Sequence, residues 1–298
     1  MWEEAKRAGS RALAFGPHSL LGLRTVIYIW LNGTGDLDEA KRVLASSPPE
    51  SKMANFCLIG NMASGNASPS SSGWWSLMKG AALVFDLDGT LVDSVPDLRF
   101  ALNEVLGGMG RRELTPDEVR RMIGDGTRAL VERALAATGT ITDFEAAHQG
   151  FLKIYEAAPA KLSRLYPGVT ETLESLRASG ARLAICTNKP QSATLGVLEG
   201  FAIGAYFDAV LGGDAVPFRK PDPRHLQAAI ERLGARASEA AMIGDNENDY
   251  AAARAAGVPV ILMRYGYLRV PPETLAPDAW LDHFSDIPQA SKKLIRKR

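Results

Sequence analysis

Short apolar runs that end in polar residues recur along the chain between residues 81 and 263. They lie at 81–85, 182–186, 209–211, 240–243 and 258–263. Because these runs are nearly continuous rather than alternating, they are typical of strands in a parallel sheet that is covered on both faces. Helical patterns separate them, for example at 168–179, 223–233 and 249–256, and Gly234 and Gly257 follow the last two. This alternation predicts a doubly wound α/β domain.

The first two predicted strands are separated by far more residues than one crossover requires. Helical patterns fill this gap at 96–106, 115–122, 127–136 and 143–157. An inserted helical subdomain is the economical explanation. We therefore predict an α/β core made of residues 78–94 and 164–298, with an all-α cap domain at 95–163.

Residues 1–77 differ in composition from the rest of the chain. Runs rich in serine and proline, at 46–49 and 68–73, favour solvated chain over packed structure. One interpretation is an N-terminal extension outside the native core, with Met78 as a natural beginning. The other is a targeting or docking segment, supported by a short amphipathic pattern at 3–13. We favour the first interpretation.

The overall composition excludes several classes of partner. Lys plus Arg (34) equals Asp plus Glu (34), so no net field attracts nucleic acid or an acidic membrane. The early apolar stretch at 20–31 contains Arg24 and is shorter than the roughly 20 residues that cross a bilayer. Cys57 and Cys186 can form neither a disulfide framework nor a zinc cluster. We therefore expect a cytoplasmic protein, either a monomer or a homodimer, with no nucleic-acid or membrane partner.

The most specific polar cluster is Asp86-Leu87-Asp88-Gly89-Thr90, directly after a predicted strand. Side chains two residues apart in extended chain point the same way, so Asp86 and Asp88 should face one pocket. Two adjacent carboxylates in a nearly dry pocket repel each other unless a cation lies between them or one holds a proton. The alternative is a simple turn at Asp88-Gly89, but the preceding strand and the second acid weaken it.

Two further clusters offer hydrogen-bond donors and positive charge at predicted strand ends. Thr187-Asn188-Lys189-Pro190 would point hydroxyl, amide and backbone N–H groups at a bound anion, because Pro190 suits the first turn of a helix. Lys220-Pro221-Asp222-Pro223 would hold Lys220 in extended chain before a helix that Asp222 caps. Taken alone, the first segment would be explained as a simple helix cap and the second as a solvated lysine in a loop.

The fourth cluster, Gly244-Asp245-Asn246-Glu247-Asn248-Asp249, is dense in side-chain oxygen atoms. Such oxygens suit a hard cation such as Mg²⁺, and the spacing is not that of an EF-hand. The helix dipole explains one acid at a helix N-terminus, but not this run. Since ligands bind beyond the carboxyl ends of strands in open α/β sheets, the four clusters together predict one site.

These clusters resemble the four motifs of the haloacid dehalogenase superfamily, and specifically its phosphatases with a helical cap inserted after the first motif. The resemblance covers residues 81–288 and rests on the Asp86 run, Thr187, Lys220 and the Gly244 run. The stretches 119–126 and 130–135 look like the cap of phosphoglycolate phosphatases, and 166–169 and 187–189 are similar too. Asn246 departs from the serine that is common in these relatives.

The resemblance implies a phosphomonoester hydrolase that works through an aspartyl phosphate. It implies that Asp86 is the nucleophile and that Asp88 protonates the leaving group and then activates water. Thr187, Asn188 and Lys220 are implied as the residues that hold the phosphoryl oxygens, with Thr187 and Lys220 also counted as catalytic.

Mg²⁺ is the cofactor that the resemblance implies. Its implied ligands are Asp86, Asp88 through the backbone carbonyl, and Asp245, while Asp249 would position Lys220 or a metal-bound water. A dehalogenase of the same fold needs neither an acid two residues after the nucleophile nor a metal. Asp88 and Asp245 therefore favour phosphate chemistry.

The cap resemblance implies 2-phosphoglycolate as the small phosphorylated substrate, hydrolysed to glycolate and phosphate. Its carboxylate needs a cation or free N–H groups, which Gly124 to Gly126, leading into a helix at Thr127, could supply with Arg128 or Arg121 nearby. We therefore include Gly124, Gly126 and Arg128 among the substrate-binding residues. Alternatively, the two glycines only form a hinge or a helix start.

Three other functions remain to be separated from this one. The nearest is another capped phosphatase, or a phosphosugar mutase similar to β-phosphoglucomutase, acting on a different small phosphorylated metabolite. A signalling receiver domain also phosphorylates an aspartate, but the acid at Asp88 and the long insertion argue against it. A non-catalytic binding protein on the same scaffold would not need all four motifs.

Overall fold

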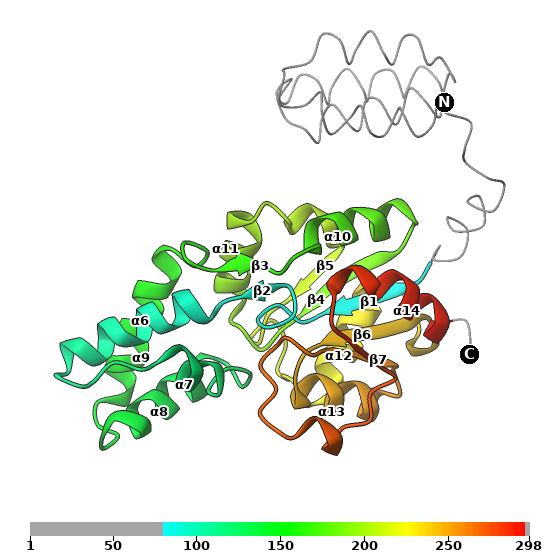
Figure 1. Cartoon of the computed structure of the whole chain (residues 1–298). Helices are drawn as coiled ribbons and strands as arrows, with labels where there is room; N and C mark the ends of the chain where they lie inside the picture. Colours follow the sequence, from blue (N-terminus) through cyan, green and yellow to red (C-terminus); the bar gives the residue numbers. More distant parts are fainter. Residues whose placement is uncertain (1–79, 296–298) are drawn as a thin grey trace, which may run out of the picture. The chain divides into compact units, whose positions relative to one another are not determined.

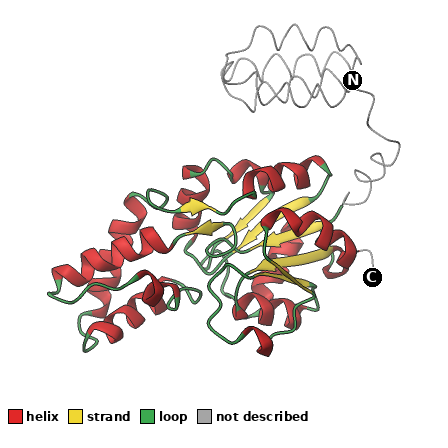
Figure 2. Cartoon of the chain, in the orientation of Figure 1, coloured by secondary structure: helices red, strands yellow, loops and turns green. Residues whose placement is uncertain are grey.

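The structure is a computed structural model that describes residues 80–295 (Figures 1 and 2). The interpretation of residues 1–77 as an extension concerns residues that lie outside this range. Within residues 80–295, no helix is both long enough and apolar enough to cross a membrane.

Six parallel strands form the main sheet, in the order β5-β4-β1-β6-β7-β8. Their bounds are β1 Ala82–Phe85, β4 Arg182–Cys186, β5 Ala209–Leu211, β6 Ala240–Gly244, β7 Val260–Met263 and β8 Ala279–Leu281. β1 lies between β4 and β6, with Phe85 opposite Ile185 on one side and Ile243 on the other. This register brings the residues that follow β1, β4 and β6 to the same edge of the sheet.

Helices cover both faces of the sheet, which confirms the predicted α/β class (Figure 1). One face packs against α10 (Val169–Ala178), α11 (Gln191–Gly200) and α14 (Ile287–Ile295), and the other against α12 (Pro223–Arg232) and α13 (Glu247–Ala256). Successive residues of β1 point to opposite sides, so Leu83 and Phe85 join the first cluster while Ala82 and Val84 join the second. Apolar side chains on both faces explain the continuous apolar pattern of these strands.

A group of four helices lies between β1 and β4 in the chain and has a hydrophobic cluster of its own. The helices are α6 (Val95–Gly108), α7 (Pro116–Arg120), α8 (Thr127–Thr138) and α9 (Phe144–Ala157), and Leu102, Leu135 and Phe151 are among their buried residues. The chain enters and leaves this group through a short antiparallel ribbon, β2 (Val92–Asp93) with β3 (Arg164–Leu165). The domain boundaries stated above remain a prediction.

Local sequence signals account for several helix ends. Asp222 caps α12, since its side chain accepts a hydrogen bond of 2.9 Å from the Arg224 N–H, as expected. Gly234 and Gly257, with φ of +62° and +67°, follow α12 and α13 in the left-handed region where glycine is favoured. Four short 3₁₀ helices complete the described chain, at Gly204–Tyr206, Ala237–Glu239, Pro272–Thr274 and Phe284–Asp286.

The sequence pattern does not reveal every element. β8, which was not predicted, is a three-residue edge strand whose residues are only partly buried, and its short apolar run lies between Asp278 and Asp282. The strand expected at 258–263 begins at Val260. The β2–β3 ribbon has two residues on each side, too few for any periodicity to be read.

Asp97 fixes the start of the helical group to its end. Its buried carboxylate, in the first turn of α6, accepts hydrogen bonds from the Leu162 N–H (2.9 Å), the Ser163 N–H (2.8 Å) and the Ser163 hydroxyl (2.5 Å). Asp97→Ala leaves these donors unpaired, so we expect the free energy of unfolding to fall by about 2–4 kcal/mol in urea denaturation.

Glu104→Ala on the same helix is the matched control, because Glu104 is exposed. It should change the free energy of unfolding by less than about 0.5 kcal/mol. An equally small effect of Asp97→Ala would show that this carboxylate does not hold the two ends of the insertion together.

Candidate active site

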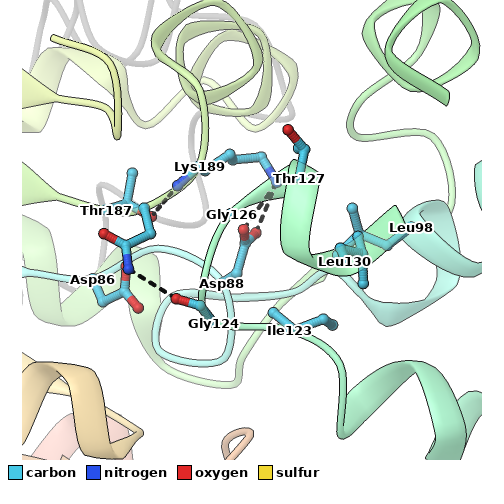
Figure 3. A pocket seen from close by; sticks show the side chains of 11 residues that line it. Asp86, Asp88, Leu98, Ile123, Gly124, Gly126, Thr127, Leu130, Thr187 and Lys189 are labelled. Atoms are coloured by element: carbon cyan, nitrogen blue, oxygen red, sulfur yellow. Dashed lines mark hydrogen bonds and ion pairs between the residues drawn. The ribbon is translucent and has the colours of Figure 1, made fainter. Parts of the chain in front are cut away.

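A pocket opens where β1 and β4 end, and the inserted helices close its other side (Figure 3). The core contributes polar residues: Asp86, Asp88, Thr187, Asn188 and Lys189. The inserted segment contributes Gly124, Gly126 and Thr127 together with the apolar Leu98, Ile123 and Leu130. The sequence-predicted residues Asp86, Asp88, Thr187, Asn188, Gly124 and Gly126 are therefore brought together.

Lys220 does not line this pocket but lies between two carboxylates, one of which belongs to the pocket residue Asp86. Its ammonium nitrogen is 2.9 Å from Asp86 Oδ1 and 2.6 Å from Asp249 Oδ1, and all three side chains are buried. Burial alone would lower the pKa of Lys220, but Asp249 and Asp86 outweigh it and raise that pKa. Lys220 is therefore a fixed positive charge beside Asp86.

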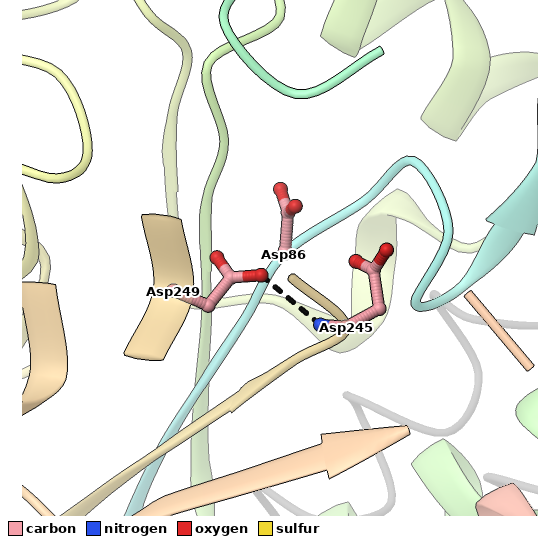
Figure 4. Close-up of side chains that lie close together, drawn as sticks. All are labelled: Asp86, Asp245 and Asp249. Carbon is pink, nitrogen blue, oxygen red and sulfur yellow. Dashed lines mark hydrogen bonds between the residues drawn. The ribbon is translucent and has the colours of Figure 1, made fainter. Parts of the chain in front are cut away.

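Asp86, Asp245 and Asp249 form an acidic cluster in which one oxygen from each residue lies within 4.8 Å of the others (Figure 4). Burial raises the pKa of Asp86 to about 6, although Lys220 opposes this shift. Burial, and then repulsion from Asp249 and Asp86, raises the pKa of Asp245 well above its usual range. One ammonium opposes three carboxylates, so a divalent cation with a preference for oxygen fits this donor set and would relieve the repulsion.

The acid Asp245 is held from two sides. The Thr90 hydroxyl donates to its Oδ1 at 2.9 Å, and the Tyr267 N–H donates to its Oδ2 at 2.7 Å. Tyr267 also reaches the start of the helical insertion, where its hydroxyl donates to Asp93 Oδ1 (2.7 Å) and accepts from the Ser94 N–H (2.8 Å). Tyr267 was not identified from the sequence, because its two roles depend on contacts between distant segments.

Asp249 positions other groups with both of its oxygens. Oδ1 faces Lys220, while Oδ2 accepts hydrogen bonds from the backbone N–H groups of Asp245 (3.0 Å) and Asn246 (3.3 Å). Asn246 caps α13 by accepting a hydrogen bond from the Asn248 N–H at 2.9 Å. Asn246, the one departure noted in this motif, thus serves as a helix cap.

Asp88 faces a second lysine rather than the acidic cluster. Lys189 Nζ lies 3.0 Å from each of its carboxylate oxygens, and the Ser94 hydroxyl donates to Oδ1 at 2.6 Å. The Asp88 carboxylate is therefore not part of the acidic cluster, which leaves only its backbone carbonyl for the metal role predicted above. The sequence offered no specific signal for this pairing of residues from different strand ends.

Asn188 joins the core to the inserted segment. Its side-chain amide donates to the carbonyl oxygens of Gly124 (2.9 Å) and Lys220 (2.8 Å), so both amide hydrogens have partners. Thr187 is buried next to it, and its hydroxyl accepts a bond of 3.3 Å from the Lys189 N–H. Thr187 thus keeps its hydroxyl hydrogen for an anion, whereas the Asn188 amide is already engaged.

Asp125 makes a polar contact between the insertion and the core. Its carboxylate accepts hydrogen bonds from both terminal nitrogens of Arg269, from Asn248 Nδ2 at 2.7 Å and from Arg133. Partial burial would raise the pKa of Asp125, but these donors, Arg269 foremost, lower it well below its usual range. Arg269 also pairs with Glu247 at 2.6 Å.

The structure does not bring Arg128, a predicted substrate-binding residue, into the pocket. Its exposed guanidinium pairs with Glu145 and lies 4.7 Å from the centre of the Phe144 ring, and it does not line the pocket. Arg128 lies one residue after Thr127 on α8, and residues adjacent in a helix point in different directions. Arg121 is exposed as well.

Comparison with known proteins gives consistent matches over the described part of the chain. Residues 83–263 match the family described as haloacid dehalogenase-like hydrolase. A phosphoglycolate phosphatase of Caulobacter vibrioides is 44% identical over 73% of this chain and 93% of its own length, and one of Rhodospirillum rubrum is 42% identical over 69% and 88%. The crystal structure of a predicted phosphoglycolate phosphatase from Haemophilus somnus is similar with a TM-score of 0.68 and 34% identity, covering 70% of this chain and 96% of that one.

Gly89 leaves room for the acidic cluster. With φ of +87°, it occupies a backbone region that other residues rarely adopt, and a Cβ atom there would lie 2.3 Å from Asp245 Oδ2. We expect Gly89→Ala to reduce kcat/KM for the hydrolysis of a phosphate ester at least about 100-fold, because the added methyl group displaces the Asp245 carboxylate. Gly110→Ala is the control, since Gly110 also has a positive φ (+67°) but open space around it. Equal rates for the two variants would mean that contact with Asp245 is not what requires glycine at position 89.

Proposed function

This chain belongs to the haloacid dehalogenase-like hydrolases, and we propose that it is a Mg²⁺-dependent phosphatase that hydrolyses 2-phosphoglycolate to glycolate and phosphate. The names of its relatives support this substrate. The observation that carries the proposal is Asp86, which lies 2.9 Å from Lys220 and also belongs to a cluster of three buried acids. A carboxylate so placed can attack phosphorus while fixed positive charge receives the phosphoryl oxygens.

Asp86 is proposed as the nucleophile. One of its oxygens attacks phosphorus, so that an O–P bond forms while the bond from phosphorus to the glycolate oxygen breaks. Asp88, which lines the same pocket, gives a proton to that departing oxygen. Asp88 then takes a proton from the water that attacks the aspartyl phosphate, which releases phosphate and restores Asp86.

Thr187 and Lys220 are proposed to hold the phosphoryl oxygens. Thr187 lines the pocket and has its hydroxyl hydrogen to offer, and Lys220 is held beside Asp86 by Asp249. Asn188, with its amide already engaged, would act by keeping the Gly124 loop and the Lys220 backbone in place. Its predicted contact with phosphate therefore loses support.

Asp86 and Asp245, with the backbone carbonyl of Asp88, are the proposed ligands of Mg²⁺. When bound, this ion would neutralise charge on the acids and on the phosphoryl group. Asp249 is proposed as a positioning residue: its Oδ1 pairs with Lys220, and its Oδ2 accepts hydrogen bonds from the backbone N–H groups of Asp245 and Asn246. A cytoplasmic location accompanies this proposal, supported by Cys186, a free and buried thiol.

Turnover of a panel of phosphate esters, with and without Mg²⁺, tests the proposed function. We expect the highest kcat/KM for 2-phosphoglycolate, at least about tenfold above sugar phosphates and other small esters, and loss of turnover when EDTA removes the metal. Addition of Mg²⁺ after EDTA treatment should restore turnover. A clear preference for a sugar phosphate would instead favour another capped phosphatase or a mutase, and turnover unaffected by EDTA would contradict the metal's role.

Replacement of the nucleophile is a separate test. Asp86→Asn should lower kcat at least about 1000-fold while leaving the circular dichroism spectrum unchanged, because an amide is a poor nucleophile of nearly the same size. Asp117→Asn, at an exposed position of α7, should keep the wild-type rate. Substantial residual activity of Asp86→Asn, measured by phosphate release, would remove Asp86 from its role.

A further inference from the structure

The pocket contains one positive charge that the proposed chemistry does not use. Among the pocket-lining residues of the described chain, Lys189 is the only cation. Its side chain is 2% exposed, and its ammonium lies 3.0 Å from both Asp88 oxygens and 4.6 Å from the centre of the Tyr155 ring. A lysine is rarely buried so deeply, because removing its charge from water is costly.

Figure 3 shows where this ammonium lies. Lys189 extends from the core toward the inserted segment, and its end meets Asp88 close to Gly126 and Thr127. Tyr155, whose ring the ammonium contacts, belongs to α9 of the insertion. The charge therefore lies between the end of β1 and the helices that close the pocket.

The role of Asp88 fixes what part of a substrate comes near this charge. A proton donor must lie within hydrogen-bond reach of the leaving oxygen, so that oxygen lies next to the Asp88 carboxylate. In 2-phosphoglycolate a single CH₂ group separates the leaving oxygen from the carboxylate. The Lys189 ammonium, which is hydrogen-bonded to the Asp88 oxygens at 3.0 Å, is thus within reach of the substrate carboxylate.

Electrostatics favours the same placement. Once Asp88 has given up its proton, its carboxylate lies beside the carboxylate of the substrate, and without Lys189 the two would repel each other. The ammonium carries three donors, so it can face a second carboxylate as well as that of Asp88. The side chains that the insertion contributes to the pocket lining, those of Leu98, Ile123, Thr127 and Leu130, carry no charge.

We propose that Lys189 binds the carboxylate of the substrate and so determines the preference for a phosphate ester with a carboxylate next to its ester carbon. This inference rests on the proposed function. In this proposal Lys189 takes the place of Arg128, which lies outside the pocket, as the cation that binds the substrate carboxylate. Lys189 would also keep Asp88 aligned, and the two roles can be separated by experiment.

Arg219 is the alternative cation and supplies the matched control. It is exposed and does not line the pocket, but a Cβ atom built at Gly126 would lie 3.3 Å from its Nη1. Arg219→Gln therefore removes a positive charge near the same segment while leaving the pocket lining intact.

The test compares 2-phosphoglycolate with ethyl phosphate, in which a methyl group replaces the carboxylate. For Lys189→Gln we expect the ratio of the two kcat/KM values to fall about 10- to 100-fold, as expected for one lost charge-assisted hydrogen bond. Lys189→Arg keeps the charge and should retain most of the preference, and Arg219→Gln should retain all of it. Any fraction of misfolded enzyme cancels in the ratio.

Two results would overturn the inference. Equal losses on both substrates in Lys189→Gln would show that Lys189 acts only through Asp88, and collapse of the ratio in Arg219→Gln would place the carboxylate elsewhere. If Lys189→Gln is too slow to assay, dissociation constants of both compounds are compared by calorimetry in Asp86→Asn with and without Lys189→Gln. Wild-type enzyme without a preference for 2-phosphoglycolate would instead refute the substrate of the proposed function, and the role of Lys189 with it.

Discussion

The buried ion pairs of Lys220 with Asp86 and Asp249 are the interaction on which the rest of the site depends. Three carboxylates lie within a few ångströms of one another in the interior, and the Lys220 ammonium contacts two of them. Such a charge distribution is stable only with further positive charge or protonation, since unpaired buried charges are costly. The sheet makes the arrangement possible, because the order β4-β1-β6 places residues from distant parts of the sequence side by side.

Much of this site could be predicted because its residues directly follow strands. Asp86, Thr187 and Asp245 each come after an apolar run, and parallel strands bring their carboxyl ends together, so the sequence places them correctly. The resemblance to haloacid dehalogenases that rested on these clusters is confirmed by the family match. The α/β class was predictable for the same reason, since strands buried on both faces have a continuous apolar pattern.

The sequence is less informative where function depends on the direction of a side chain. Arg128 was predicted to bind substrate because it lies near Gly126, but the helix turns it toward Glu145. The ion pair of Lys189 with Asp88, and that of Arg269 with Asp125, join segments distant in sequence. No periodicity or spacing encodes such pairs. The motifs shared by a superfamily thus identify the chemistry, while the contacts that select a substrate become visible only in three dimensions.

Tyr267 links the acidic cluster to the start of the inserted helices. Its backbone N–H donates to Asp245, while its hydroxyl bonds Asp93 and Ser94 where the chain leaves the sheet for the inserted helices. Rotation of those helices about the ribbon must therefore either carry this tyrosine along or break its bonds. Asp245 and the start of the inserted helices are in this way joined through the backbone and the side chain of one residue, so a displacement of those helices that moved Tyr267 would also disturb Asp245.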